Sequence, residues 1–222
     1  RSLSQDLQVV IQKKLLGTAD ALRSTEGFLK NFAGDVLILS GDTPLLTVET
    51  VRRVVKRHQT SGAACTFLTM DVDRPHGYGR IIRDQNNKVI AIREEKDASP
   101  AEKEIFEINA GVYCFRAGIL FEFLKSVKLN RKKKEFYLTD VIDLLVQENA
   151  KVETIKTADE CEGLGINTRE DLSSAESLIQ KKILRRFMRS GVTIVDPQTT
   201  YINADVKIKG DTVIRPFTVI EQ

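Results

Sequence analysis

The sequence has neither a segment that could cross a membrane nor a large excess of charge of one sign. None of its apolar runs approaches the roughly 18 residues that a membrane-spanning helix needs. Its 34 Lys and Arg residues nearly balance 31 Asp and Glu residues, which gives a formal net charge of +3. This balance argues against a strongly basic surface of the kind that binds nucleic acid. We therefore expect neither a membrane nor a nucleic acid as a partner.

Cysteine and histidine are too few and too dispersed for the usual metal and catalytic groupings. The cysteines Cys65, Cys114 and Cys161 have no spacing typical of a zinc site. Their odd number argues against a disulfide framework, so a reducing, cytoplasmic compartment is expected. His58 and His76 have no neighbour in the sequence that indicates a catalytic dyad. Walker A, Gly-x-Ser-x-Gly and Gly-x-Gly-x-x-Gly motifs are also absent.

Strand-like and helical patterns alternate along the first third of the chain. Residues 7–11 are short and β-branched, and residues 36–39 form a continuous apolar run typical of strands covered on both faces. Residues 64–70 follow as a further strand. Apolar side chains recur at helical spacing over 18–32 and 48–61. This alternation predicts a doubly wound α/β sheet.

The pattern then changes. Residues 80–83, 88–95 and 107–116 are expected to be strands joined without long helices, an antiparallel excursion that could cover a site. The elements expected after them are helices at about 117–127 and 137–149 and strands at 151–156 and 163–166.

One long helix is predicted over residues 168–190. Thr168 is the expected N-cap, acidic residues fill the first turn, and lysines and arginines crowd the last turns. Gly191 is expected to end the helix. The helix would thus link a first domain, residues 1–167, to a last part of different character, residues 191–222.

The last part has a sixfold period. Ile202, Ile208, Ile214 and Ile220 recur every six residues, which neither a helix nor a simple strand produces. A period of six in a β-rich stretch is the mark of a hexapeptide β-helix. Residues 191–222 are therefore expected to hold the first coil of such a solenoid, which gains stability from stacked neighbours.

Ligands of open α/β sheets bind beyond the carboxyl ends of the strands. Asp42 ends the run Ser40-Gly41-Asp42 after one predicted strand, and Asn167 follows the strand expected at 163–166. The two side chains could supply oxygen ligands to Mg²⁺, which completes its shell with water and phosphate. A turn at Asp42 and a helix cap at Asn167 are alternatives that the pattern leaves open.

Other candidate positions lie at the ends of predicted elements. Gln12, Gly17 and Thr18 flank the end of the first strand, where Gly17 could lie against a flat base and Thr18 could instead cap a helix. The charge run at 131–134 is interpreted as a solvated loop rather than as a site that steers phosphates. Three further positions are unremarkable singly: Gly79, Glu94 and Asn109.

A series of short motifs runs along the whole chain and resembles a known family. The motifs are Gln12 five residues before Gly17-Thr18, Leu39-Ser40-Gly41-Asp42-Thr43-Pro44-Leu45, Gly77-Tyr78-Gly79-Arg80-Ile81-Ile82, Glu94-Glu95-Lys96-Asp97-Ala98, Glu107-Ile108-Asn109-Ala110-Gly111, Glu135-Phe136-Tyr137-Leu138-Thr139-Asp140 and Gly165-Ile166-Asn167. In this order, and followed by a helix and hexads, they resemble the bacterial N-acetylglucosamine-1-phosphate uridyltransferase / glucosamine-1-phosphate acetyltransferase family. Any one motif is shared with other sugar-phosphate nucleotidyltransferases.

The resemblance implies a Rossmann-like nucleotidyltransferase fold with a doubly wound mixed sheet, a linker helix and the first coil of a left-handed hexapeptide β-helix. It also implies roles. Gln12, Gly17 and Thr18 would hold uracil, Asp42 and Asn167 would bind Mg²⁺, and Gly79, Glu94 and Asn109 would grip the N-acetylglucosamine moiety, with Ser40, Gly41, Tyr137 and Thr139 completing the substrate-binding set. Ser40 stands where the family has a tyrosine, and Ala19-Asp20 replaces its Gly-His.

The implied reaction is attack by the phosphate oxygen of N-acetylglucosamine-1-phosphate on the α-phosphorus of UTP, which gives UDP-N-acetylglucosamine and pyrophosphate. A sugar phosphate is already an anionic nucleophile, so positioning and charge neutralisation replace a side-chain base. Two alternatives stay open: a glucose-1-phosphate uridylyl- or thymidylyltransferase, and a non-catalytic sugar-nucleotide sensor.

The chain opens at Arg1 and is interpreted as a fragment. The family's opening strand, its Gly-x-Gly-Thr-Arg-Met loop and following Pro-Lys, and most of its acetyltransferase domain have no counterpart here. The chain alone is therefore expected to be nearly inactive. For the complete protein, the resemblance implies a homotrimer assembled through the hexapeptide solenoid.

Overall fold

The computed structural model describes residues 7–29, 31–159 and 161–221, and these residues form two compact units. The first unit comprises residues up to Ser40 together with Leu46–Gly163, and the second comprises Gly41–Leu45 together with residues from Leu164 onward. The short loop Gly41–Leu45 thus groups with the later part of the chain. The division predicted from the sequence, at residues 167 and 190, stays a prediction.

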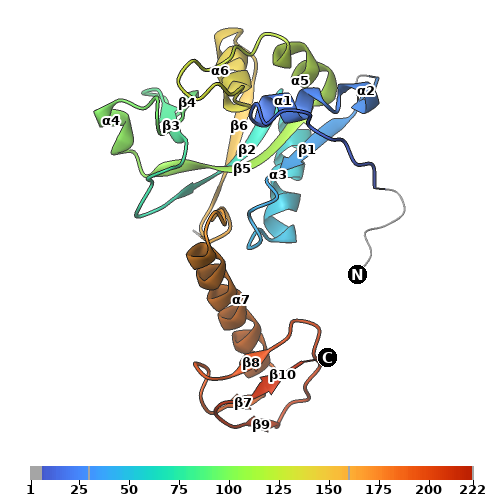
Figure 1. The fold of residues 1–222 in the computed structure, drawn as a ribbon, viewed down its shortest axis with the longest axis vertical. Helices are drawn as coiled ribbons and strands as arrows, with labels where there is room; N and C mark the ends of the chain where they lie inside the picture. The colour runs from blue at the N-terminus through green and yellow to red at the C-terminus, as the bar shows by residue number, and fades with distance from the viewer. Residues whose placement is uncertain (1–6, 30, 160, 222) are drawn as a thin grey trace. The chain divides into compact units, whose positions relative to one another are not determined.

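The first unit is built on a six-stranded mixed sheet, shown in Figure 1. The strands are β1 (Asp35–Leu39), β2 (Cys65–Asp71), β3 (Arg80–Arg83), β4 (Val89–Arg93), β5 (Glu107–Arg116) and β6 (Val152–Thr157). Their order is β4-β3-β5-β2-β6, and β1 also pairs with β5. The central strand β5 runs antiparallel to β1, β2 and β3, whereas β2 and β6 are parallel.

Helices cover both faces of this sheet. They are α1 (Thr18–Arg23), α2 (Glu26–Leu29), α3 (Val48–Ser61), α4 (Pro100–Lys103), α5 (Ala117–Leu124) and α6 (Thr139–Gln147). On one face, Phe67 and Phe115 pack with apolar residues of α1, α5 and α6. On the other, Leu68 and Cys114 pack with Val54 of α3, so successive strand residues enter different cores. The predicted doubly wound mixed sheet is confirmed.

The helix α3 shows how local sequence sets these elements. Its N-cap residue Thr47 accepts a hydrogen bond from the backbone N–H of Thr50 at 3.2 Å, and Gly62 ends it with φ 65°. Glycine adopts this left-handed conformation without steric penalty. The helix therefore begins and ends where its capping residues place it, as the sequence pattern indicates.

Three predictions about strands are wrong. Residues 7–11 are not a strand: Val9 and Ile11 are 80% and 81% exposed, and the segment pairs with no strand among the described residues. A β-branched run forms a strand only where a neighbour supplies backbone partners. Residues 163–166 also form no strand. The backbone N–H of Ile166 donates to the carbonyl of Asp42, and this hydrogen bond belongs to no strand ladder.

The third correction concerns the burial of β1. Leu37 and Leu39 are 36% and 47% exposed, whereas Val36 and Ile38 pack against the core. The strand is therefore covered on one face only. The helical pattern at 18–32 is also interrupted, since α1 ends at Arg23 and the Thr25 hydroxyl donates to the carbonyl of Leu22 in the turn before α2.

The second unit consists of one long helix and short paired strands. They are α7 (Arg169–Arg189), β7 (Thr193–Ile194), β8 (Tyr201–Ile202), β9 (Val213–Ile214) and β10 (Val219–Ile220). Thr168 caps α7 in a capping box with Asp171, as predicted. The helix packs Phe187 and its apolar neighbours against Ile194, Ile202 and Ile214.

The short strands of the second unit pair in parallel, β7 with β9 and β8 with β10. Parallel pairing between successive turns is what a stacked coil requires. The assignment to a left-handed hexapeptide β-helix stays a prediction. Across both units, no helix in the described part of the chain is long and apolar enough to span a bilayer.

Candidate functional site

The predicted uracil-binding residues lie together at the start of α1. The Gln12 Nε2 atom donates to the carbonyl of Gly17 at 3.1 Å and to Asp20 Oδ2 at 2.8 Å. The Thr18 hydroxyl oxygen accepts a hydrogen bond from the backbone N–H of Leu138 at 3.0 Å. Thr18 is the first residue of α1, and the N-cap position belongs to Gly17, so the capping alternative for Thr18 does not hold. We call Gln12, Gly17 and Thr18 the α1 end.

Gly17 is needed for a contact within the protein. Its φ is 95°, and a Cβ at this position would lie 2.6 Å from the carbonyl oxygen of Phe136. Backbone hydrogen bonds on both sides hold this approach: Phe136 donates to Leu16 at 2.7 Å, and Ala19 donates to Phe136 at 3.0 Å. The α1 end is thereby fixed to the segment that carries Tyr137 and Thr139.

That segment leads to the predicted sugar-binding residues. The Thr139 hydroxyl donates to Glu94 Oε1 at 2.9 Å. A Cβ at Gly79 would lie 3.5 Å from the same oxygen, and the carbonyl of Gly79 accepts from the backbone N–H of Asn109 at 2.9 Å. We call Gly79, Glu94 and Asn109 the Glu94 end.

Asn109 continues the line of contacts along β5. Its Nδ2 atom donates to the hydroxyl of Tyr113, and its Oδ1 accepts from the backbone N–H of Gly111 at 3.2 Å. The Ser40 hydroxyl donates to the carbonyl of Gly111 at 3.3 Å. Contacts therefore connect all the predicted site residues of the first unit into one set. The path of contacts begins at Gln12 and ends at Ser40.

Burial sets the electrostatics of the Glu94 end. Desolvation raises the pKa of Glu94, against the hydrogen bond from Thr139 and the charge of Lys133. Burial and the charge of Glu94 raise the pKa of Tyr137 to about 12, and its hydroxyl has no hydrogen-bond partner among the described residues. A buried hydroxyl without a partner is available to a bound polar ligand.

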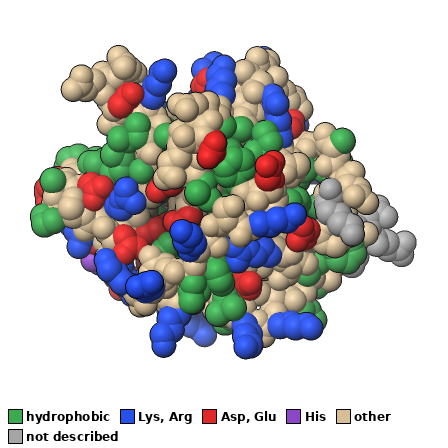
Figure 2. Space-filling view, turned by 90° about the horizontal axis from the view of Figure 1, so that it is seen from above, with side chains coloured by type: hydrophobic (Ala, Val, Ile, Leu, Met, Phe, Trp, Pro, Cys, Tyr) green, Lys and Arg blue, Asp and Glu red, His purple; other side chains and the backbone are tan. Residues whose placement is uncertain are grey.

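The charge run at 131–134 is largely exposed, as predicted, and two of its lysines also contact other side chains. Lys132 Nζ lies 2.8 Å from Asp97 Oδ1, and Lys133 Nζ lies 5.6 Å from the centre of the Tyr137 ring. Elsewhere, basic and acidic side chains are interspersed with apolar ones on the face drawn in Figure 2. The charge of Lys133 acts on Glu94, and it thus comes from a loop to which the sequence analysis assigned no function.

The two predicted metal ligands lie in the second unit, and both side chains come close to Gly165. A Cβ at Gly165 would be 3.3 Å from Asp42 Oδ2 and 3.6 Å from Asn167 Nδ2. Both side chains are exposed, and Thr168 rather than Asn167 caps α7. A half-turn of the Asn167 amide would exchange Nδ2 for an oxygen, the ligand type that Mg²⁺ prefers. A carboxylate and an amide meeting beside a glycine thus fit a hard cation.

No group of three or more His, Cys, Asp or Glu side chains among the described residues could hold a metal ion. The pair Asp42 and Asn167 offers two side chains, which suits a cation that takes its other ligands from phosphate and water.

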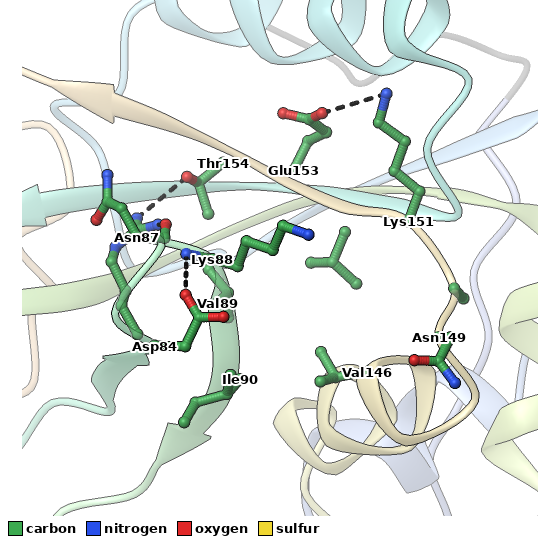
Figure 3. A pocket seen from close by; sticks show the side chains of 13 residues that line it. Asp84, Asn87, Lys88, Val89, Ile90, Val146, Asn149, Lys151, Glu153 and Thr154 are labelled. Atoms are coloured by element: carbon green, nitrogen blue, oxygen red, sulfur yellow. Dashed lines mark hydrogen bonds and ion pairs between the residues drawn. The ribbon is translucent and has the colours of Figure 1, made fainter.

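A cavity of about 650 Å³ lies elsewhere in the first unit, at the turn between β3 and β4 and the start of β6 (Figure 3). Figure 3 shows Lys88 extending into it, with Lys151 bound to Glu153 at its rim. Asp84 Oδ1 accepts from the backbone N–H of Lys88 at 2.8 Å and so shapes the turn. None of the predicted site residues lines this cavity.

Two charged residues beside the Glu94 end were not among the site residues predicted from the sequence. Arg80 directly follows Gly79 and is 2% exposed, and Glu95 directly follows Glu94. The Arg80 Nη2 atom lies 2.7 Å from Glu95 Oε2. Adjacency to two candidate residues was the only signal, because an arginine and a glutamate at strand ends usually lie on a solvated surface.

The sequence profile of the nucleotidyl transferase family matches residues 2–182. The chain therefore belongs to the nucleotidyl transferase family. The structure of a UDP-glucose pyrophosphorylase complexed with UDP-glucose is similar, with a TM-score of 0.57 and 17% identity over 77% of this chain and 64% of that one. At this identity the likeness concerns the fold, and it confirms the predicted Rossmann-like nucleotidyltransferase architecture.

Within this family the chain is most informatively compared with curated relatives. It is 46% identical to the bifunctional protein GlmU of Pelotomaculum thermopropionicum over 95% of this chain and 46% of that protein. It is 42% identical to the bifunctional protein GlmU of Lactobacillus johnsonii, over 99% of this chain and 48% of that protein. The chain thus spans about half the length of the curated relatives it matches.

Proposed function

We propose that the full-length protein transfers uridylyl from UTP to N-acetylglucosamine-1-phosphate and releases UDP-N-acetylglucosamine and pyrophosphate. The observation that carries the proposal is the connected set of contacts from the α1 end through Thr139 to the Glu94 end. These contacts join the α1 end, whose residues suit a base, to the Glu94 end, whose residues suit a sugar. The likeness to bifunctional GlmU proteins supports the choice of these two substrates.

The α1 end would hold the uracil. The Gln12 amide oxygen can accept a hydrogen bond from the edge of a pyrimidine, while its Nε2 atom already donates to Gly17 and Asp20 and so fixes the amide orientation. Gly17 keeps the backbone close to Phe136, so the turn that carries these groups is rigid before the nucleotide arrives. A rigid turn avoids the entropy loss of ordering it on binding.

The Glu94 end would hold the sugar. The carboxylate of Glu94 can accept hydrogen bonds from sugar hydroxyls while Thr139 fixes its orientation. The Asn109 amide and the unpartnered hydroxyl of Tyr137 add polar groups to the same end. Such a set could distinguish a sugar that fills it from one that leaves its polar groups unpaired.

In the reaction, the phosphate oxygen of the sugar phosphate would form a bond to the α-phosphorus of UTP as the bond to pyrophosphate breaks. The nucleophile is already ionised, so no residue of the chain has to remove a proton. The residues of both ends would contribute by orienting the two substrates. Mg²⁺ held by Asp42 and Asn167 would supply charge neutralisation and a template for the phosphates.

The activity test uses the full-length protein with UTP and with either N-acetylglucosamine-1-phosphate or glucose-1-phosphate. We expect kcat/KM to favour N-acetylglucosamine-1-phosphate by about 10⁴-fold, as for a site that hydrogen-bonds the distinguishing group. Preference for glucose-1-phosphate would favour the alternative transferase. Tight UDP-N-acetylglucosamine binding without turnover of either sugar would favour the sensor.

The metal assignment has its own test. We expect Asp42→Ala to weaken Mg²⁺-dependent binding of UDP-N-acetylglucosamine, measured by calorimetry with and without Mg²⁺. Asp73→Ala removes an exposed carboxylate from the connection after β2 and should leave the dependence unchanged. Equal dependence on Mg²⁺ in Asp42→Ala and the wild type would contradict the assignment.

We also propose a cytoplasmic homotrimer. The described cysteines are free thiols, which suits a reducing compartment. The parallel strands of the second unit suit continued stacking into a solenoid through which copies could associate. Light scattering of the full-length protein should give three times the mass of one chain, and the mass of a monomer would contradict the trimer.

A further inference from the structure

Arg80 is a buried arginine whose hydrogen-bonding groups are not all used. It is 2% exposed, its Nη2 lies 2.7 Å from Glu95 Oε2, and its Nη1 donates to the carbonyl of Tyr78. Its Nε has no hydrogen-bond partner among the described residues. A buried charge with an unpaired N–H is costly, and an apolar side chain is often as stable in such a place. Stability alone therefore gives little reason for an arginine here.

Glu95 joins Arg80 to the turn before it. The side chain of Glu95 is 18% exposed, and its Oε2 also accepts a hydrogen bond from the backbone N–H of Gly77 at 3.2 Å. Burial would raise the pKa of Glu95, but the hydrogen bonds from Arg80 and Gly77 hold it below its ordinary value. The carboxylate is therefore ionised at neutral pH and binds both groups at once.

The two residues connect the parts of the chain that carry the Glu94 end. Arg80 follows Gly79 directly, Glu95 follows Glu94 directly, and Arg80 pairs with Arg93 in the ladder between β3 and β4. Gly79 packs closely against β4, since a Cβ at this position would lie 3.0 Å from Ile92 Cγ2. A shift of the turn would therefore displace Gly79 and Glu94 together.

We infer that Arg80 and Glu95 form a positioning pair, which holds the Gly77–Gly79 backbone and Glu94 in the arrangement that receives the sugar phosphate. The inference rests on the proposed function and deepens it. Neither residue is assigned a contact with substrate. The pair acts on the affinity for the sugar phosphate and not on the affinity for UTP.

A second ion pair on the same strand provides a matched control. Arg83 Nε and Nη2 bind the two oxygens of Glu107 at 2.8 and 2.7 Å. Arg83 also donates to Thr154, and no candidate site residue is among these partners. Arg83→Lys therefore perturbs another arginine–glutamate ion pair of β3, a bidentate one, without touching the Glu94 end.

The experiment measures the KM for N-acetylglucosamine-1-phosphate and for UTP separately in the full-length protein. For Arg80→Lys and Glu95→Gln, we expect the KM for the sugar phosphate to rise about tenfold or more, because displacements near 1 Å have effects of this size. The KM for UTP should stay within about twofold of wild type. Arg83→Lys should change neither constant. An equal rise in both constants, or no rise in either, would overturn the inference.

A double variant separates positioning from stability. Arg80→Met with Glu95→Leu replaces the pair by apolar groups, so the melting temperature should return close to that of wild type. The KM for the sugar phosphate should stay raised. A folded double variant with the wild-type KM would overturn the inference even if both single variants fail to fold. If the wild type transfers uridylyl to neither sugar, the proposed function fails; if it is active and the variants match it, only the positioning role fails.

Discussion

Different interactions stabilise the α1 end and the Glu94 end of the first unit. At the α1 end, the contacts to residues 136–138 are mainly hydrogen bonds of the backbone, and Gly17 makes their close approach possible. At the Glu94 end, carboxylates are held by Thr139 and by a buried arginine. The first end should therefore respond to backbone geometry, and the second to charge and pH.

The largest expected effect tests the backbone end. In Gly17→Ala, the added Cβ would lie 2.6 Å from the Phe136 carbonyl at a φ of 95°. Relief requires the turn to move, so we expect kcat/KM for UTP to fall about a hundredfold and the free energy of unfolding to fall by about 2 kcal/mol. Steady-state kinetics and thermal unfolding of the full-length protein measure these changes.

Gly27→Ala is the matched control, since it lies in α2 with nothing within 4 Å of the added Cβ. It should leave kcat/KM for UTP unchanged and should raise the free energy of unfolding slightly, by up to about 1 kcal/mol, because alanine favours a helix over glycine. A Gly17→Ala protein with wild-type kinetics would show that the close approach has no part in nucleotide binding.

The next effect tests the carboxylate end. Thr139→Val keeps the shape of a buried side chain but removes the hydrogen bond to Glu94. The half-buried carboxylate of Glu94 would lose this partner, and we therefore expect the affinity for the sugar phosphate to fall about tenfold. The KM for UTP should not change. Separate titrations of the two substrates measure this, and equal changes in both constants would contradict the division into two ends.

A smaller effect concerns stability at the same end. Burial, together with the charges of Asp143 and Glu94, raises the pKa of Asp140 from its ordinary 3.8 to about 6. The folded state therefore binds a proton more tightly than the unfolded state, and this contribution to stability is lost as pH rises from about 4 to about 6.

Asp140→Asn mimics the protonated form at all pH values. After allowance for partial exposure, we expect it to raise the free energy of unfolding by about 1 kcal/mol near neutral pH and to have little effect below about pH 4. Denaturant unfolding at several pH values measures the difference. A gain that is the same at every pH would assign the effect to packing instead of charge.

The accuracy of the predictions from the sequence also differs between backbone elements and buried charges. The strands 80–83 and 107–116 and the helix 48–61 are predicted at their observed bounds, because local periodicity and capping determine them. The strand predicted at residues 7–11 is wrong because a β-branched composition does not supply a pairing partner. Arg80 was missed because it pairs with Glu95, which is fifteen positions away in the sequence. Periodicity thus predicts backbone elements, whereas buried charge pairs depend on tertiary contacts that it does not contain.

The smallest expected effect separates charge from hydrogen bonding at the Glu94 end. Desolvation raises the pKa of Glu94, and the charge of Lys133 partly opposes it. Lys133→Met should therefore raise that pKa further. The pH below which affinity for the sugar phosphate is lost should move upward, and only slightly, since a single partly screened charge is removed. Lys134→Met, on the exposed neighbour, should not move it. A downward shift would show that Lys133 does not stabilise the ionised form of Glu94.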